Sequence, residues 1–397
     1  RTEDALRFSS EHDRWTGLLN RAYLERLLEN DAASRTGEKR ALIGVNLAAI
    51  QSLSKVYGFH YTQDLLRQIA DALRTLCDER LTACDDRLTL FNTYENRFVL
   101  YVKRYEDAAE LLRLSEAVAD ALIPLLAAER IGGGIGVLEI DPNGGRNVDQ
   151  MLKKLLIASE RAMEIPDRYV GISFFDRAME EDIVRDEELK RELACIAAAG
   201  EGPCGLFLEY QPILDVAEDR ICGFEALVRL QSKTYGRVSP LDFIPLAEKT
   251  KLIIPLGEHI LRKACRFLRR LQEAGHRSVS VSVNISAIQL LSDGFAGRFF
   301  TILEEEGVPP ASMGIELTES VFSMEYQVIN RILETLRAAG VHTAIDDFGT
   351  GYSSLARERD LSIDCLKIDR SFIQRLSELA PEQAITGDIV SMAHKLG

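Results

Sequence analysis

Acidic, amide and lysine side chains interrupt a series of short apolar segments in the second half of the sequence. They are Glu225, Asn284, Glu316, Asp346, Asp347 and Lys367. Carboxylates that converge on one point repel one another unless a cation lies between them. Carboxylates joined by one amide oxygen suit hard divalent ions such as Mg²⁺ or Mn²⁺, and no histidine accompanies them as a zinc site would favour. These residues therefore form a candidate metal centre.

Each of these residues also has an ordinary explanation when it is taken alone. Glu225 could be a surface acid on an edge strand, Asn284 a turn or cap residue, and Glu316 the partner of a nearby arginine. The Asp346–Asp347 pair, which Phe and Gly follow, could form a plain strand-to-turn junction. Lys367 could simply be solvated. Their recurrence at matching places in successive segments favours one shared site.

Three of the segments, 279–283, 314–317 and 341–345, follow helices that end in the same way, and segment 365–368 follows without such a stop. Gly275, Gly307 and Gly340 each close a helical segment, because glycine readily adopts the left-handed conformation found at helix ends. The apolar segments that form the series are 221–227, 279–283, 314–317, 341–345 and 365–368. Repeated helix–strand units of roughly 30 residues predict a (β/α) barrel of the TIM type, whose strand ends meet at one mouth. An open doubly wound sheet is the nearest alternative.

The first half of the sequence also alternates helical and apolar segments, but with a different spacing. Helical spacing extends from the start to about residue 30, through Leu18, Leu19, Leu24, Leu27 and Leu28, and recurs over 61–76 and 148–163. Apolar runs predict strands at 41–47, 98–102, 131–140 and 171–174. This alternation predicts an α/β domain over residues 1–175. A charged segment over 176–204 predicts a helical connector that ends in an alanine-rich turn at 197–203.

The composition limits the partners and the compartment. The 397 residues carry a formal net charge of -14, and a surface this acidic disfavours a nucleic-acid polymer while allowing a small anionic ligand. The seven cysteines include no Cys-x-x-Cys pair, which is typical of free thiols in a reducing compartment. The sequence starts at Arg1 without a signal peptide. We therefore expect the cytoplasmic part of a larger membrane-anchored or soluble sensor, whose N-terminal sensor region is missing here.

A set of motifs in the second half resembles the EAL domain family. Residues 225–229 read Glu-Ala-Leu-Val-Arg, which matches the signature that gives the family its name. The other matching segments, in the family's order, are 210–213 (Tyr-Gln-Pro-Ile), 240–248, 283–286, 316–319 (Glu-Leu-Thr-Glu), 346–355 and 366–369 (Leu-Lys-Ile-Asp). The resemblance covers nearly all of residues 205–397, and it implies an EAL barrel.

The resemblance implies hydrolysis of cyclic di-GMP to the linear dinucleotide pGpG, assisted by two Mg²⁺ or Mn²⁺ ions. The ligands of the first ion in this family correspond to Glu225, Asn284, Glu316 and Asp346. Asp346 and Asp347 correspond to ligands of the second ion. In this family Asp347 also counts among the catalytic residues.

Four further residues have roles implied by the same resemblance. Lys367 would position or help to activate the attacking water, and Arg229 would hold a phosphate of the substrate. Gln211 corresponds to a second substrate-binding residue. Glu319 corresponds to a catalytic residue that shapes the metal site from outside it.

The first half resembles a GGDEF domain whose functional positions have changed. Residues 12–21 read His-Asp-Arg-Trp-Thr-Gly-Leu-Leu-Asn-Arg, which is similar to the start of that family. The namesake motif reads Tyr-Glu-Asn-Arg-Phe over 94–98, where bulky side chains replace two glycines that would admit a nucleotide. Asn46 stands at the position of the first metal aspartate, and Asp167 where a lysine would meet the triphosphate. We expect an inactive, regulatory or dimerising domain rather than a cyclase.

Two functions from different classes remain open at this point. A signalling phosphodiesterase is favoured because the full metal set is present, and a catalytically silent cyclic-di-GMP receptor that acts on a partner is the alternative. The sequence stops at Gly397, before a strand with a catalytic glutamate and the closing strands expected of an EAL domain. We therefore expect an EAL domain truncated before its last strands, and poor or no turnover of substrate by this chain alone.

Overall fold

A computed structural model describes ten parts of the chain. They are residues 10–33, 38–80, 87–141, 147–166, 168–199, 205–318, 321, 326–348, 362–374 and 385–396. The chain divides into two compact units, residues 1–184 and 185–397. Within the described ranges, no helix combines the length and the apolar character needed to cross a bilayer.

The first unit is built on a six-stranded mixed sheet with the order β1-β3-β4-β2-β5-β6. Its strands are β1 (Leu19–Asn20), β2 (Arg40–Asn46), β3 (Leu88–Tyr94), β4 (Arg97–Lys103), β5 (Gly133–Ile140) and β6 (Val170–Phe174). The central strand β2 is antiparallel to both neighbours, whereas β5 and β6 are parallel. The predicted α/β class is confirmed, although β1 and β3 were not predicted.

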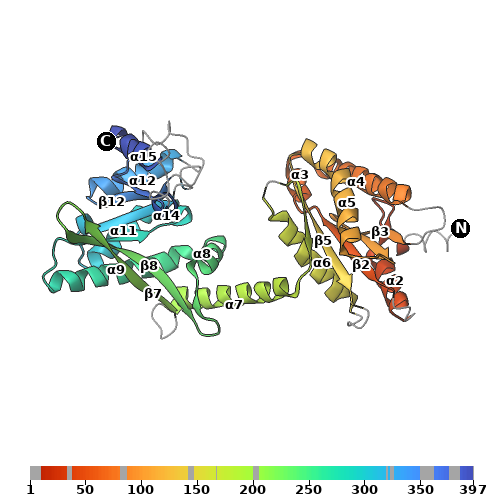
Figure 1. Cartoon of the computed structure of the whole chain (residues 1–397), viewed down its shortest axis with the longest axis horizontal. Helices are drawn as coiled ribbons and strands as arrows, with labels where there is room; N and C mark the ends of the chain where they lie inside the picture. The colour runs from red at the N-terminus through yellow and green to blue at the C-terminus, as the bar shows by residue number, and fades with distance from the viewer. Residues whose placement is uncertain are drawn as a thin grey trace. The chain divides into compact units, whose positions relative to one another are not determined.

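Two layers of helices cover this sheet (Figure 1). They are α4 (Phe59–Arg80) and α5 (Ala108–Ala128) on one face, and α2 (Arg21–Ala33) and α6 (Val148–Met163) on the other, while α3 (Ile50–Tyr57) follows β2. Alternation along β2 separates the two cores, because Ile43 and Val45 pack with α4 and α5 whereas Leu42 packs with α2 and α6. Helix α6 lies so close to β5 that a Cβ at Gly134 would meet the Ser159 carbonyl oxygen at 2.0 Å.

The prediction of one helix through the first 30 residues is wrong for Leu18 and Leu19. A turn precedes α2, in which the carboxylate of Asp13 accepts hydrogen bonds from the backbone N–H groups of Trp15 and Thr16. Gly17 completes this turn with a φ of 67°. The local side-chain bonds therefore outweigh the helical spacing of the leucines, and Leu19 enters β1.

The two units are joined by α7 (Arg177–Ala199). A helical connector was predicted here, but the predicted turn at 197–203 is wrong at its start, because residues 197–199 continue the helix. The rest of that turn lies outside the described residues. Leu189, Leu193 and Ile196 of α7 are buried in a core of the second unit, which explains their helical spacing.

In its described residues the second unit contains seven strands, six of them in the order β13-β12-β11-β10-β8-β7, with β9 paired to β8. They are β7 (Gly205–Asp215), β8 (Arg220–Ser232), β9 (Gly236–Val238), β10 (Ser280–Asn284), β11 (Met313–Thr318), β12 (His342–Phe348) and β13 (Cys365–Ile368). Strands β8 and β10 to β13 are parallel, and β7 pairs antiparallel with β8. Within the described residues, β7 and β13 form the edges of this sheet.

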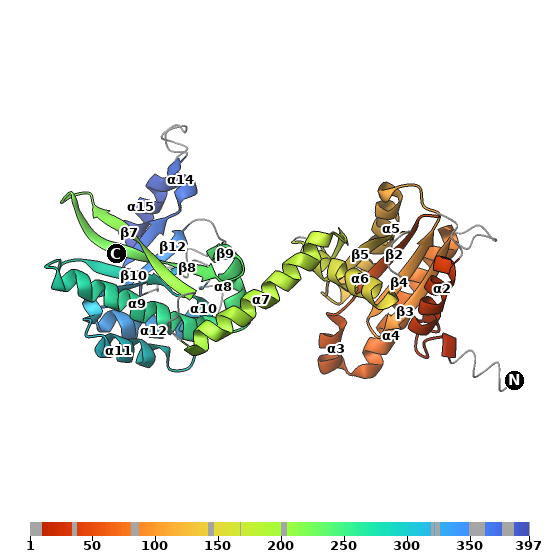
Figure 2. The same cartoon turned by 90° about the horizontal axis from the view of Figure 1, so that it is seen from below.

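The helices of the second unit are α8 (Pro240–Lys249), α9 (Ile253–Glu273), α10 (Ala287–Leu290), α11 (Phe295–Glu305), α12 (Tyr326–Ala338), α14 (Arg370–Gln374) and α15 (Ile385–Leu396). Helices α9, α11 and α12 share one core with one face of the sheet (Figure 2). A doubly wound sheet would carry helices on both faces, so this arrangement supports the predicted TIM-like barrel wall. Gly275, Gly307 and Gly340 have φ values of 99°, 67° and 90°, as expected for glycines that end helices.

Candidate metal centre

The strand register places the predicted polar residues on one face of the second sheet. Glu225 of β8 is the partner of Ser282 in β10, Asn284 is the partner of Glu316 in β11, and Asp346 in β12 is the partner of Thr318. Partner residues on neighbouring parallel strands point to the same side. The residues that alternate with them, such as Val283, Ile315 and Ile345, pack beneath the helices. The face of the sheet that points away from the helices therefore carries the predicted site residues.

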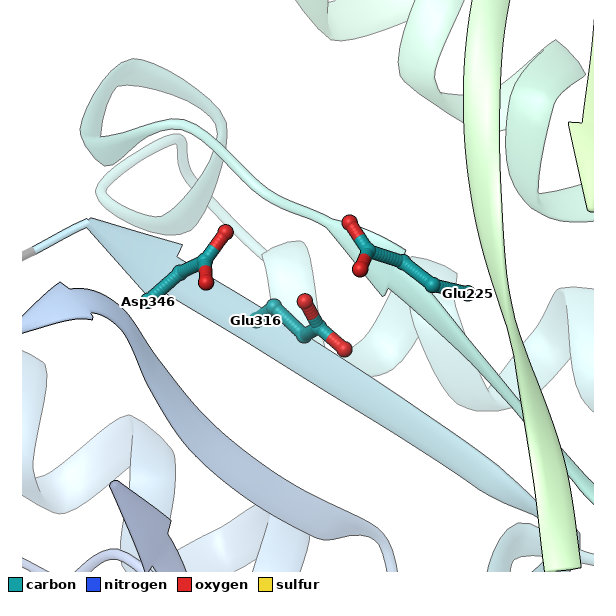
Figure 3. A group of neighbouring side chains, drawn as sticks. All are labelled: Glu225, Glu316 and Asp346. Carbon is teal, nitrogen blue, oxygen red and sulfur yellow. The ribbon is translucent and has the colours of Figure 1, made fainter. Parts of the chain in front are cut away.

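Three carboxylates converge on this face. One oxygen from each of Glu225, Glu316 and Asp346 lies within 4.8 Å of the others, as Figure 3 illustrates. The Glu316 side chain is the most buried of the three at 3% exposure, against 14% for Glu225 and 22% for Asp346. Asn284 lies beside them, because its amide nitrogen donates to Glu225 Oε1 at 2.9 Å. Four side chains from four strands thus surround one point.

The ammonium group of Lys367 from β13 lies among these carboxylates. Its Nζ is 2.9 Å from Glu225 Oε2 and 3.1 Å from Asp346 Oδ1, and it also contacts Glu316 Oε2. Burial alone would lower the pKa of Lys367, but the bonds to Glu316 and Glu225 outweigh burial and raise it. Burial raises the pKa of Glu316, although the hydrogen bonds from Lys367 and Ser282 act to lower it. The centre therefore already holds one cation, which balances part of its negative charge.

Asp347 breaks the regular alternation of β12. Its φ is 54°, in the left-handed region that non-glycine residues rarely adopt, and the β12–β13 register shifts between Ile345 and Phe348. Burial, followed by the charges of Asp346 and Asp369, raises the pKa of Asp347. Asp347 is not part of the group of three converging carboxylates found in the described residues. Strain at this position is of a kind that clusters at functional sites.

The predicted substrate-binding residues lie on the same side of the sheet. Gln211 of β7 is the partner of Glu225, and Arg229 follows Glu225 by four residues along β8. Arg229 Nε donates to Glu209 Oε2 at 2.7 Å, and its Nη1 donates to the Val228 carbonyl at 2.9 Å. Glu319 lies outside the described residues, so its predicted role is not addressed by the structure.

Sequence reasoning missed Ser282, whose hydroxyl donates to Glu316 Oε1. The available signal was its position two residues before Asn284, on the same face of the same strand. The oxygens of the three carboxylates fit a hard divalent cation better than zinc, while Asn284 turns its amide nitrogen toward Glu225. The contacts that Lys367 already makes support this fit, because they bind a positive charge at the same oxygens.

Tyr94 and Asn46 of the first unit lie at or beside the β3–β4 turn. Tyr94 is held there between two arginines, because its hydroxyl contacts Arg21 and its ring lies 5.4 Å from the Arg97 guanidinium carbon. Asn46 is buried, and its amide oxygen accepts from the Ala48 N–H at 3.1 Å. Asp167 lies outside the described residues. Tyr94 is thus bound to other protein groups, whereas the buried Asn46 Nδ2 and Arg97 Nε find no hydrogen-bond partner in the described part of the chain.

Comparison with known families agrees with both halves of the fold. The EAL domain model matches residues 202–397, and the model of the diguanylate cyclase GGDEF domain matches residues 10–165. The fold and the acidic strand ends define a (β/α)-barrel protein with a candidate cation site. The chain is a tandem GGDEF–EAL protein, and its second unit matches the EAL domain family.

Individual relatives show how far the similarity extends. The bifunctional diguanylate cyclase/cyclic di-GMP phosphodiesterase MucR of Pseudomonas aeruginosa is 32% identical over 392 residues, which is 97% of this chain and 55% of MucR. The cyclic di-GMP phosphodiesterase NbdA of the same organism is 35% identical over 255 residues, 64% of this chain and 32% of NbdA. The chain spans about half the length or less of these curated relatives.

A solved structure spans both units. The S helix–GGDEF–EAL portion of Vibrio cholerae LapD, bound to c-di-GMP, covers 100% of this chain, and 91% of that structure is covered in return. Its TM-score is 0.54 and its sequence identity is 18%, so the likeness concerns the fold alone.

Proposed function

We propose that this protein hydrolyses cyclic di-GMP to pGpG at the acidic centre of its EAL barrel. The observation that carries the proposal is the convergence of Glu225, Glu316 and Asp346 on one point of an EAL-family domain. A protein that only binds a nucleotide has no need for three carboxylates and a lysine at that point. The names of the relatives MucR and NbdA, which both include this activity, support the same reaction.

The cofactor in this proposal is a pair of Mg²⁺ or Mn²⁺ ions. Glu225, Asn284, Glu316 and Asp346 would hold one ion, and Asp346 with Asp347 would hold the other. Such ions, when bound, lower the pKa of a water molecule and offset the charge of the phosphodiester. The three converging carboxylates and the position of Asn284 beside Glu225 support this assignment.

The remaining roles in the proposal belong to the side chains around the centre. Lys367 orients the attacking water through its ammonium hydrogens, because it stays protonated among the carboxylates. Arg229 binds a phosphate oxygen of the substrate, and its bonds to Glu209 and to a backbone carbonyl support a fixed orientation. Gln211 contacts the substrate from β7, and Glu319 shapes the metal site.

An assay of the full-length protein tests this function. Incubation with cyclic di-GMP and Mn²⁺ is expected to yield pGpG, and addition of excess EDTA is expected to stop the reaction. Separation of the nucleotides by chromatography measures both. Tight binding of cyclic di-GMP without any pGpG would contradict the proposal and favour the alternative, a silent receptor that acts through a protein partner.

The first unit is proposed to have no cyclase activity. Tyr94, in contact with Arg21 and Arg97, stands at the turn where a nucleotide would need close backbone approach, and Asn46 offers an amide in place of a carboxylate. Incubation of the full-length protein with GTP and Mg²⁺ is expected to give neither cyclic di-GMP nor pGpG, the product to which the second unit would convert it. The printed name of MucR describes a bifunctional relative, so detection of either product would show that the substitutions at residues 94–97 are tolerated.

The proposal also includes the organisation of the chain. Residues 1–175 form a GGDEF-like regulatory or dimerising module, 176–204 a helical connector and 205–397 the EAL domain, which agrees with family matches at 10–165 and 202–397. A cytoplasmic location is part of the same proposal. The free thiols of Cys77 and Cys265 in the described core support it, because such thiols suit a reducing compartment.

A further inference from the structure

We propose that Ser282 is a positioning residue that fixes the Glu316 carboxylate for cation binding, an inference that rests on the proposed metal centre. The Ser282 hydroxyl donates to Glu316 Oε1, while Glu316 Oε2 receives the Lys367 ammonium. Lys367 also contacts Glu225 and Asp346, so Oε2 is the oxygen that faces the other carboxylates. Ser282 thus holds Oε1 of Glu316, and thereby keeps Oε2 turned toward the other carboxylates.

The neighbouring strand leaves room for this contact. Gly314 of β11 is the partner of Ser282, and it lies two residues before Glu316 on the same face. A Cβ added at Gly314 would lie only 3.1 Å from the Ser282 Cβ and 3.5 Å from the His342 carbonyl oxygen. A larger residue at position 314 would therefore press on Ser282. The absence of a side chain there gives Ser282 the space below Glu316.

Burial explains why one hydroxyl should matter for this carboxylate. Glu316 is almost fully buried, so water does not readily replace a lost hydrogen bond. Without Ser282, Glu316 could rotate about its terminal bond, because torsions to carboxylate groups have broad minima. Groups that orient a metal ligand in this way typically change metal affinity by about 10–100-fold when they are removed.

Ser280 provides a matched control within the same strand. It lies two residues before Ser282 on the same face of β10, and its partner is Gly223 of β8. Its hydroxyl oxygen is 2.8 Å from the position that a Cβ on Gly223 would occupy. Ser280 and Gly223 thus repeat the serine–glycine pairing one step further from the carboxylates, so removal of the Ser280 hydroxyl leaves Glu316 with its donors.

Calorimetric titration of the full-length protein with Mn²⁺ tests this role directly. Ser282→Ala is expected to weaken Mn²⁺ binding by about 10–100-fold, whereas Ser280→Ala should stay within about twofold of the unaltered protein. Ser282→Thr and Ser282→Val form a second matched pair. The threonine and valine side chains have nearly the same shape and both suit a strand, but only threonine keeps the hydroxyl. Threonine is expected to retain Mn²⁺ affinity, and valine is expected to lose it as alanine does.

The same titration separates this inference from the proposed activity. Equal Mn²⁺ affinity in the threonine and valine variants, or equal losses in the Ser280 and Ser282 variants, would overturn the role of Ser282. Absence of Mn²⁺ binding by the unaltered protein would overturn it as well. If the unaltered protein binds Mn²⁺ but forms no pGpG, the phosphodiesterase proposal fails while the threonine–valine comparison still decides the role of Ser282.

Discussion

Replacement of Asp346 by Asn is expected to lower the rate of cyclic-di-GMP hydrolysis by about 10²–10³-fold, the typical effect of losing one electrostatic group that stabilises a transition state. Asp346 is proposed to contact both ions, so loss of its charge would weaken the binding of both. Asparagine keeps the shape of the side chain but removes the charge that faces Glu225, Glu316 and Lys367. The measurement is the initial rate of pGpG formation at saturating substrate and Mn²⁺.

A second aspartate serves as the control for this substitution. Asp293 is exposed in the segment before α11, and Asp293→Asn makes the same chemical change outside the centre. Its rate should remain within about twofold of the unaltered protein, as is usual for surface substitutions. A rate for Asp346→Asn within tenfold of the unaltered protein would contradict the two-ion assignment, provided that the variant unfolds at a similar temperature.

The strands of the second unit could be predicted from the sequence because residues close to each strand set where it begins. Helices α9, α11 and α12 each end at a glycine in the left-handed conformation, and an apolar strand follows. Parallel neighbours then bring their carboxyl ends together, which is why Glu225, Glu316 and Asp346 could be expected near one another. The catalytic and binding roles of these residues remain predictions.

The elements that were missed lack such local signals. The β3–β4 turn runs through Tyr94 and Arg97 without a glycine, so the usual sequence signal of a tight hairpin is absent. Helix α5 contains Pro124 and carries apolar residues around much of its surface, which obscures a helical period. The Ser282–Glu316 contact depends on the register of two strands, and register is set by tertiary packing rather than by neighbouring residues.

Lys367→Met is expected to separate metal binding from turnover more clearly than any carboxylate substitution. The ammonium contacts the same carboxylates that are proposed to bind the first ion, so its removal takes away a competing cation. Mn²⁺ should therefore bind at least as tightly as in the unaltered protein. Hydrolysis should still fall by about 10²-fold or more, because the group proposed to orient the water is lost.

The stability of Lys367→Met provides the second half of this test. Without Lys367, the almost fully buried Glu316 faces Glu225 and Asp346 with no partner cation, and loss of one member of a buried pair costs about 3–5 kcal/mol. The metal-free variant should therefore unfold at a lower temperature than the unaltered protein, and Mn²⁺ should restore most of the difference, since a ligand of the folded state stabilises it. Thermal unfolding with EDTA or with Mn²⁺ measures both effects. If Lys367→Met instead binds Mn²⁺ more weakly, the ammonium must support the ion rather than compete with it, and the placement of the first ion among Glu225, Glu316 and Asp346 would be wrong.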